Sequence, residues 1–128
     1  MRKIPFLLML LSIFVITSCN VINPKLQKIQ IELENVSDET IENITFHGID
    51  YGTLESGKVS TYQFHEPFYR QTMPYCEGTI DGQKAGNMVG LICFIDESDI
   101  LKSGKYTIEI DYETTEEGQA NLSLKFKE

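Results

Sequence analysis

Apolar and polar side chains alternate with a period of two residues in several short stretches of this chain. The clearest example covers residues 105–112, in which two tyrosines and two isoleucines alternate with charged or polar residues. A period of two is typical of a strand with one buried and one solvated face. After residue 19 no stretch shows a helical period of useful length. The sequence therefore predicts an all-β domain.

Seven to eight short strands are predicted, with turns every eight to twelve residues. Alternation or an apolar run predicts strands in 28–34, 44–46, 59–64, 75–80, 89–95, 105–112 and 120–126. Residues typical of turns occur in 37–39, 51–58, 81–88 and 116–118. This pattern suits an antiparallel immunoglobulin-like β-sandwich that follows a cleaved N-terminal signal peptide. The chain has no tryptophan, so the buried tryptophan of antibody domains is missing.

The first nineteen residues, MRKIPFLLMLLSIFVITSC, have the pattern of a secretory signal. Arg2 and Lys3 supply a positive start, and an apolar run follows over residues 6–16. That run is well short of the roughly 20 residues that a membrane-spanning helix needs. We therefore expect a cleaved signal rather than a retained transmembrane anchor.

The sequence Ile-Thr-Ser-Cys at 16–19 resembles a bacterial lipobox. The resemblance implies that the Cys19 sulfur receives a diacylglyceryl group, that cleavage makes Cys19 the first residue, and that its amine is acylated with a chain such as palmitate. Two or more acyl chains hold a protein stably on a membrane, whereas one does so only marginally. We expect a signal peptide over 1–18, a lipidated tether over 19–26 and a β-sandwich domain over 27–128. A plain cleaved signal with a chance cysteine is the alternative.

The lipobox implies a location in the bacterial cell envelope, with the domain in the periplasm or at the cell surface. Position 20 is not acidic, which favours the outer membrane over the inner one. Eleven basic side chains stand against nineteen acidic ones, a formal charge of −8. Loss of Arg2 and Lys3 with the signal leaves nine against nineteen, or −10. This sign argues against nucleic acid as a partner, and we expect contact with the membrane through the lipid on Cys19.

A wider resemblance covers most of the chain after the tether. The runs YGTLESGKVSTYQF, TIDG, GKYTIEIDY and NLSLKF are similar to those of small bacterial lipoproteins that carry an immunoglobulin-like sandwich and have no assigned activity. The resemblance implies a fold and a location. It assigns no catalytic residue, cofactor or metal, and it supplies no disulfide.

Three cysteines form an odd set, and lipidation of Cys19 leaves Cys76 and Cys93 as a candidate disulfide in an oxidising compartment. The register of the hairpin between them decides whether they can meet. A tight two-residue turn places Cys76 opposite Asn87 and roughly 20 Å from Cys93 along the strand. An eight-residue loop over 81–88 places the two cysteines opposite each other, and we favour it because both strands then share an apolar face. Two buried thiols or a redox-active pair are the alternatives.

Side chains suited to catalysis are scarce. The histidines His47 and His65 each lie beside an apolar phenylalanine in sequence, so alternation predicts that both face solvent. They lack the close spacing of a zinc ligand pair. Asp96, Glu97 and Asp99 are a candidate calcium cluster without EF-hand spacing, and a hydrated acidic loop is the simpler interpretation. We assign no catalytic, cofactor-binding or metal-binding residue.

Aromatic residues are dense within fourteen positions, namely Tyr62, Phe64, Phe68, Tyr69 and Tyr75. They either build the core or form a platform for a sugar or a protein partner. The leading hypothesis is a membrane-anchored envelope lipoprotein whose domain is a non-catalytic interaction or structural module. A ligand-binding accessory protein for carbohydrate, peptide or metal is the alternative, and an enzyme with an unrecognised site is the third.

Overall fold

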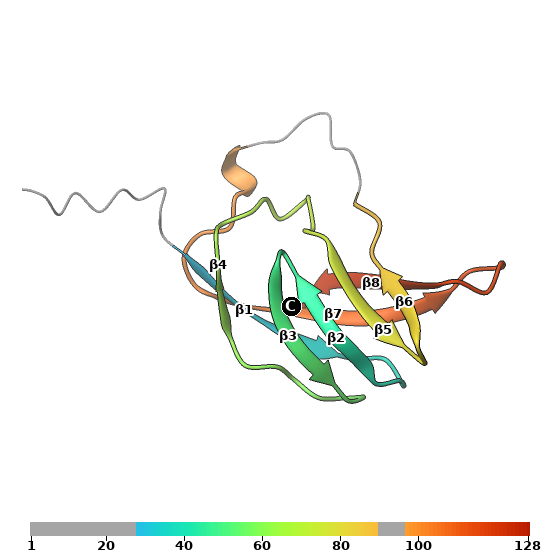
Figure 1. Cartoon of the computed structure of the whole chain (residues 1–128). Coiled ribbons are helices and arrows are strands. Elements are labelled where there is room, and N and C mark those ends of the chain that lie inside the picture. The colour runs from blue at the N-terminus through green and yellow to red at the C-terminus, as the bar shows by residue number, and fades with distance from the viewer. Residues whose placement is uncertain (1–27, 90–96) are drawn as a thin grey trace, which may run out of the picture.

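The computed structural model of this chain describes residues 28–89 and 97–128. These residues contain eight strands and one short 3-10 helix, η2 (Glu97–Asp99) (Figure 1). The strands are β1 (Ile29–Asn35), β2 (Ile41–Phe46), β3 (Ile49–Leu54), β4 (Gln63–His65), β5 (Cys76–Ile80), β6 (Gln83–Gly86), β7 (Lys105–Thr114) and β8 (Ala120–Phe126). No α-helix occurs in this part of the chain, so the all-β prediction is confirmed.

All eight strands join into one hydrogen-bonded sheet, in the order β3-β2-β5-β6-β8-β7-β1-β4. Most neighbours are antiparallel, but β1 pairs in parallel with β7, and β6 pairs in parallel with β8. The purely antiparallel prediction is therefore wrong. Alternation within a strand reports which residues share a face, and it carries no information about the direction of a partner that is distant in sequence.

The sheet curls until its two end strands, β3 and β4, approach each other, and it nearly closes into a barrel (Figure 1). Strand twist favours such curling. The Tyr51 hydroxyl of β3 donates a hydrogen bond to the Ile31 carbonyl of β1 at 3.0 Å, which joins the two sides of the open seam. The interior is filled by apolar side chains without solvent exposure: Ile29, Ile31, Leu33, Ile41, Ile44, Phe46, Cys76, Ile108 and Ile110.

Strands β1, β5, β7 and β8 lie where the alternation predicts them, and every second residue of β1 is buried. Two segments predicted as turns contain strands instead, since β3 enters 51–58 and β6 lies within 81–88. The pattern of β3 is obscured by a bulge at Gly52, whose positive φ of 74° interrupts the pairing with β2. The strand predicted over 59–64 is reduced to β4, and most of the strand predicted over 89–95 lies outside the described residues.

A two-residue turn at Asp81 and Gly82 sets the register of the β5–β6 hairpin. Both residues have positive φ, 50° and 77°, as a type I′ turn requires, and Asp-Gly is a favoured sequence for it. Cys76 consequently lies opposite Asn87. The Cys76 backbone N–H donates to the Asn87 side-chain oxygen at 2.7 Å, and the Asn87 backbone N–H donates to the Cys76 carbonyl at 3.2 Å. The eight-residue loop favoured from the sequence is therefore wrong, and the tight-turn alternative is confirmed.

A buried amide fastens the end of β1 to its surroundings. The Asn35 side-chain nitrogen donates to the carbonyls of Glu39 at 2.7 Å and Leu54 at 2.9 Å. Its side-chain oxygen accepts from the backbone and the hydroxyl of Ser37 at 3.0 and 2.6 Å. Because Asn35 has no solvent exposure, these bonds satisfy an amide that would otherwise be costly to bury. They hold the β1–β2 turn and the end of β3 in place.

The close approach of β5 to β2 leaves no room for a side chain at Gly78. A β-carbon there would lie 2.6 Å from Cγ2 of the buried Ile41. At Gly86 a β-carbon would instead meet the half-exposed ring of Tyr75, which can move aside. We expect Gly78→Ala to lower the free energy of unfolding by about 1–3 kcal/mol, the usual cost of overpacking, and Gly86→Ala to cost clearly less. Urea unfolding of both variants measures the difference, and equal losses would contradict this packing.

Candidate functional site

His65 lies in the core and not at the surface. It pairs with the fully buried Ile29 across the β1–β4 ladder, and residues opposite each other on neighbouring strands face the same side of a sheet. Its side chain is therefore turned inward and only 2% exposed, while the adjacent Phe64 points outward and is 60% exposed. The prediction of a solvated side chain is wrong for His65 and confirmed for His47, which is exposed.

The His65 ring shares a short hydrogen bond with a tyrosine. Its Nε2 atom lies 2.5 Å from the Tyr51 hydroxyl, which already donates its proton to the Ile31 carbonyl. The Tyr51 oxygen must therefore accept, so His65 carries its proton on Nε2. The Nδ1 atom of His65 is buried without a hydrogen-bond partner, as fits the unprotonated nitrogen of a neutral ring.

His47, Tyr51 and His65 form a stack that we call the histidine–tyrosine cluster. The two imidazole rings are parallel, with centroids 5.7 Å apart and an interplanar angle of 1°. The Tyr51 ring lies 5.8 Å from His65 at 13°, and Phe46 meets His65 edge-on at 5.4 Å. The cluster joins the β2–β3 hairpin to β4 across the seam where the sheet does not close.

Burial keeps the ionisable groups around this cluster neutral. It lowers the pKa of His65 to about 4, and the neighbouring His47 adds to the shift. Burial likewise raises the pKa of Tyr51, with a smaller contribution from Cys76. The pKa of the Cys76 thiol is raised to about 12 by burial and then by the charge of Glu77. A neutral imidazole and a protonated thiol held away from solvent are packing groups, and neither is a prepared nucleophile.

The shifted pKa of His65 predicts a pH-dependent stability. Between pH 6.5 and 4 the unfolded chain binds a proton at His65 that the folded protein excludes. The contribution of His65 to the free energy of unfolding is therefore complete above pH 6.5 and is lost as the pH drops toward 4. The loss reaches about 3 kcal/mol. We expect His65→Gln to remove this part of the pH dependence in urea unfolding at pH 7 and pH 4, and the control His47→Gln to retain most of it. Identical profiles for the natural chain and His65→Gln would contradict the assignment.

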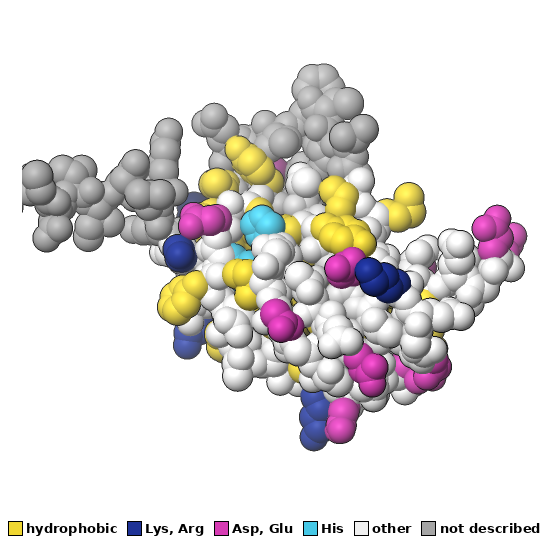
Figure 2. Space-filling model, viewed as in Figure 1, with side chains coloured by type: hydrophobic (Ala, Val, Ile, Leu, Met, Phe, Trp, Pro, Cys, Tyr) yellow, Lys and Arg dark blue, Asp and Glu magenta, His cyan; other side chains and the backbone are white. Residues whose placement is uncertain are grey.

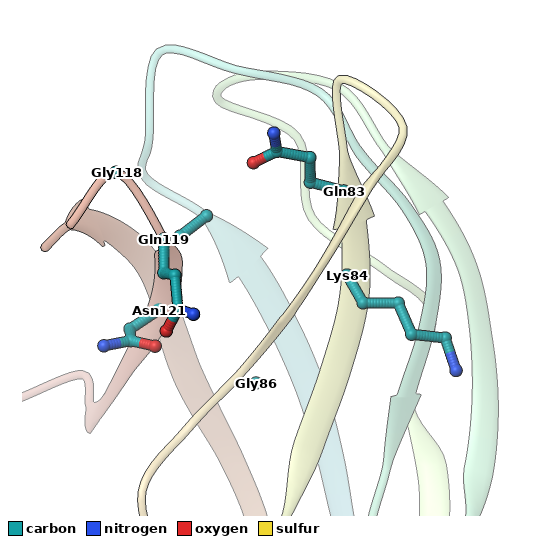
Figure 3. A pocket seen from close by; sticks show the side chains of 7 residues that line it. Gln83, Lys84, Gly86, Gly118, Gln119 and Asn121 are labelled. Carbon is teal, nitrogen blue, oxygen red and sulfur yellow. The ribbon is translucent and has the colours of Figure 1, made fainter.

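A polar recess, here called the amide recess, opens between β6 and β8 (Figure 3). The two strands pair at one position only, Gly86 with Asn121. The recess has a volume of about 540 Å³ and is lined by Gln83, Lys84, Gly86, Gly118, Gln119, Ala120 and Asn121. Figure 3 shows the Gln83 side chain extending toward the side of Gln119, whereas Lys84 points away.

Backbone groups of β6 face this recess. In the tight hairpin Ile80 pairs with Gln83, and hydrogen-bonded and non-hydrogen-bonded pairs alternate along an antiparallel ladder. The Lys84 N–H and C=O therefore point away from β5 and toward β8. The pairing between β6 and β8 is limited to Gly86 and Asn121. Side-chain amides add donors and acceptors. This arrangement can hydrogen-bond a polar ligand such as a sugar or an extended peptide.

Within 28–89 and 97–128, no three His, Cys, Asp or Glu side chains gather closely enough to hold a metal ion. Of the acidic residues considered from the sequence, Asp96 lies outside the described residues, and Glu97 and Asp99 are the ends of η2. The Asp99 carbonyl accepts a hydrogen bond from the Arg70 amide at 2.9 Å. Its backbone therefore ties η2 to the loop after β4.

The five aromatic residues divide between core and surface. Phe68 is buried and meets Phe46 edge-on at 5.9 Å, and Tyr69 is half-buried. The exposed ones are Tyr62, Phe64 and Tyr75. Neither of the two alternatives drawn from the sequence describes all five. The residues lining the amide recess include none of them.

Cys19 and Cys93 lie outside the described residues. The Cys76 thiol is buried and free, and it lies in the register for which the sequence argument predicts no bridge to Cys93. Lipidation of Cys19 and a bridge between Cys76 and Cys93 both stay predictions. The described part of the chain contains no helix of the length and apolarity that a membrane span needs.

No protein-family profile matches the chain, and no curated protein matches it. It is similar in structure to a protein from Eubacterium rectale solved by NMR, with 16% sequence identity and a TM-score of 0.49. The match covers 77% of this chain and 88% of that one. A likeness at this level carries no argument about function.

Proposed function

We propose that this chain is a bacterial envelope lipoprotein, anchored through Cys19, whose β domain is a non-catalytic interaction or structural module. The anchor is supported by the positive start, the short apolar run and the lipobox-like ending of residues 1–19. The non-acidic position 20 favours the outer membrane. The domain then stands in the periplasm or at the cell surface.

The placement of His65 is the observation that supports a non-catalytic domain. A hydrolytic site needs a nucleophile and a base within reach of substrate. His65 is stacked between His47 and Tyr51 in the interior, and Cys76 is buried with its proton retained. In the described chain these two groups serve packing, which leaves the surface as the functional part of the domain.

We further propose that the curled sheet is an immunoglobulin-like sandwich in architecture. The β3-β2-β5 side and the β8-β7-β1 side lie over a common apolar core (Figure 1). Side-chain bonds connect them, including that from Asn35 of β1 to the Leu54 carbonyl of β3. Two layers over one core are the property that defines a sandwich.

A second candidate function, the binding of carbohydrate or peptide by an accessory protein, is favoured by the amide recess. Its side-chain amides and the backbone of β6 at Lys84, where β8 is not paired, offer donors and acceptors. Recognition of an extended peptide would add main-chain hydrogen bonds to Lys84. Recognition of a sugar would use the amides of Gln83, Gln119 and Asn121.

The lipid anchor is tested by Cys19→Ala, which removes the acceptor sulfur. We expect mass spectrometry of the variant to show no acylated N-terminal peptide. In a detergent phase separation of solubilised membranes, we expect the variant to be lost from the detergent phase. Ser12→Ala, a change within the signal that keeps Cys19, is the matched control and should remain acylated. An unmodified Cys19 peptide from the natural chain would overturn the proposal.

The amide recess is tested by the double variant Gln83→Ala and Gln119→Ala. We expect any oligosaccharide or peptide that binds the natural chain on an array to lose at least about tenfold in affinity, roughly the effect of two hydrogen bonds. Thr53→Ala, an exposed change on β3, should bind normally. Unchanged binding by the double variant would place the ligand elsewhere.

A further inference from the structure

The two ends of the domain differ in the chain segments that form them. We call the end at which β1 begins the tether end, because the chain enters the domain there at Lys28. Parallel and antiparallel pairings place the start of β7 and the last residues of β4 and β8 at the same end. The opposite end consists of the turns at 36–40, 81–82 and 115–119 (Figure 1).

The opposite end is acidic. Its described charged residues are the acids Asp38, Glu39, Glu55, Asp81, Glu116 and Glu117 and the bases Lys58 and Lys84. The described charged side chains at the tether end are the bases Lys28, Arg70, Lys102, Lys105 and Lys127 and the acids Glu66, Asp99 and Glu128. A negatively charged bilayer surface therefore repels the opposite end much more strongly than the tether end.

Three large apolar side chains remain exposed at the tether end, namely Tyr62, Phe64 and Ile100. Phe64 pairs with Gln30, two residues from the point where the chain enters the domain. In Figure 2 apolar and acidic side chains are both spread over the visible face of the domain. Exposed apolar side chains are stabilised when they leave water for an apolar environment.

The length of the tether limits which end can reach the membrane. Nine residues, 19–27, separate the lipid-bearing sulfur from Lys28, and at full extension they span about 30 Å. The ten-residue strand β7 separates the two ends by about 33 Å. The tether end is therefore always within reach of the bilayer, and contact by the opposite end would require a nearly straight tether folded back along the domain.

We propose that the tether end lies on the phospholipid bilayer and that the acidic end, with the amide recess, faces away from it. This inference rests on the proposed acylation of Cys19. Phe64 and Ile100 enter the interfacial region of the bilayer, where exposed Lys102 and Lys105 meet lipid phosphates. The overall charge keeps the rest of the domain off the surface, so the protein has one preferred orientation.

Lysine labelling tests this orientation within a single molecule. The full-length protein, purified from membranes in detergent, is reconstituted into protein-free vesicles of phosphatidylcholine and phosphatidylglycerol and treated with a membrane-impermeant amine reagent. Lys102 and Lys105 report on the tether end, and Lys58 and Lys84, which are also exposed, report on the opposite end. We expect tether-end labelling to fall several-fold relative to the opposite end in the outward-facing population.

Two double variants provide matched controls. Phe64→Ser with Ile100→Ser removes exposed apolar groups from the tether end and should restore equal labelling, while Val36→Ser with Val59→Ser makes a similar change at the opposite end and should leave the contrast intact. Circular dichroism checks that each variant is folded.

The outcomes separate the two proposals. Equal labelling of both ends in an acylated, vesicle-bound protein overturns the orientation and leaves the lipoprotein assignment standing. An N-terminal peptide without acyl chains overturns the assignment and this inference with it. Protection seen in native membranes and lost in protein-free vesicles overturns the bilayer as the occupant and indicates a protein partner.

Discussion

The parallel ladder between β1 and β7 is the constraint on which the rest of the structure depends. It joins the first strand of the domain to the C-terminal hairpin through six residue pairs. β1 then lies between β7 and β4, with its isoleucine and leucine side chains fully buried. Because this ladder brings the beginning and the end of the domain together, the strands between them must curl over the same apolar face. The mixed, nearly closed sheet follows from that pairing together with the parallel contact between β6 and β8.

Side chains complete what the backbone ladder leaves open. The sheet has two free ends, β3 and β4, and the histidine–tyrosine cluster spans them by ring stacking and by the bonds of Tyr51. At the far end of β1 the Asn35 side-chain amide also links β1 to β3, through its hydrogen bond to the Leu54 carbonyl. Buried polar groups are tolerated here because nearly all of their bonds are satisfied within the protein. The groups with the most reactive chemistry therefore serve the fold.

With the interior committed to packing, interactions are left to the two ends of the barrel. At one end the single contact between β6 and β8 leaves amides and backbone groups accessible. At the other, apolar side chains remain uncovered beside the point where the chain enters. In the orientation that we propose, one of these ends faces the membrane and the other faces the space beyond it. That division would suit the interaction module that we propose.

The sequence by itself determined the all-β class, the positions of β1, β5, β7 and β8, and the inward faces of Ile108 and Leu122, because a period of two residues is a local property. Only the tertiary structure decided the parallel pairings, the tight β5–β6 register, the burial of His65 and the amide recess. A three-residue strand such as β4 shows too little alternation to define its own face, so its register with Ile29 on β1 sets the direction of His65. The recess likewise exists because two strands distant in sequence meet at one residue pair and then part, which no local pattern records.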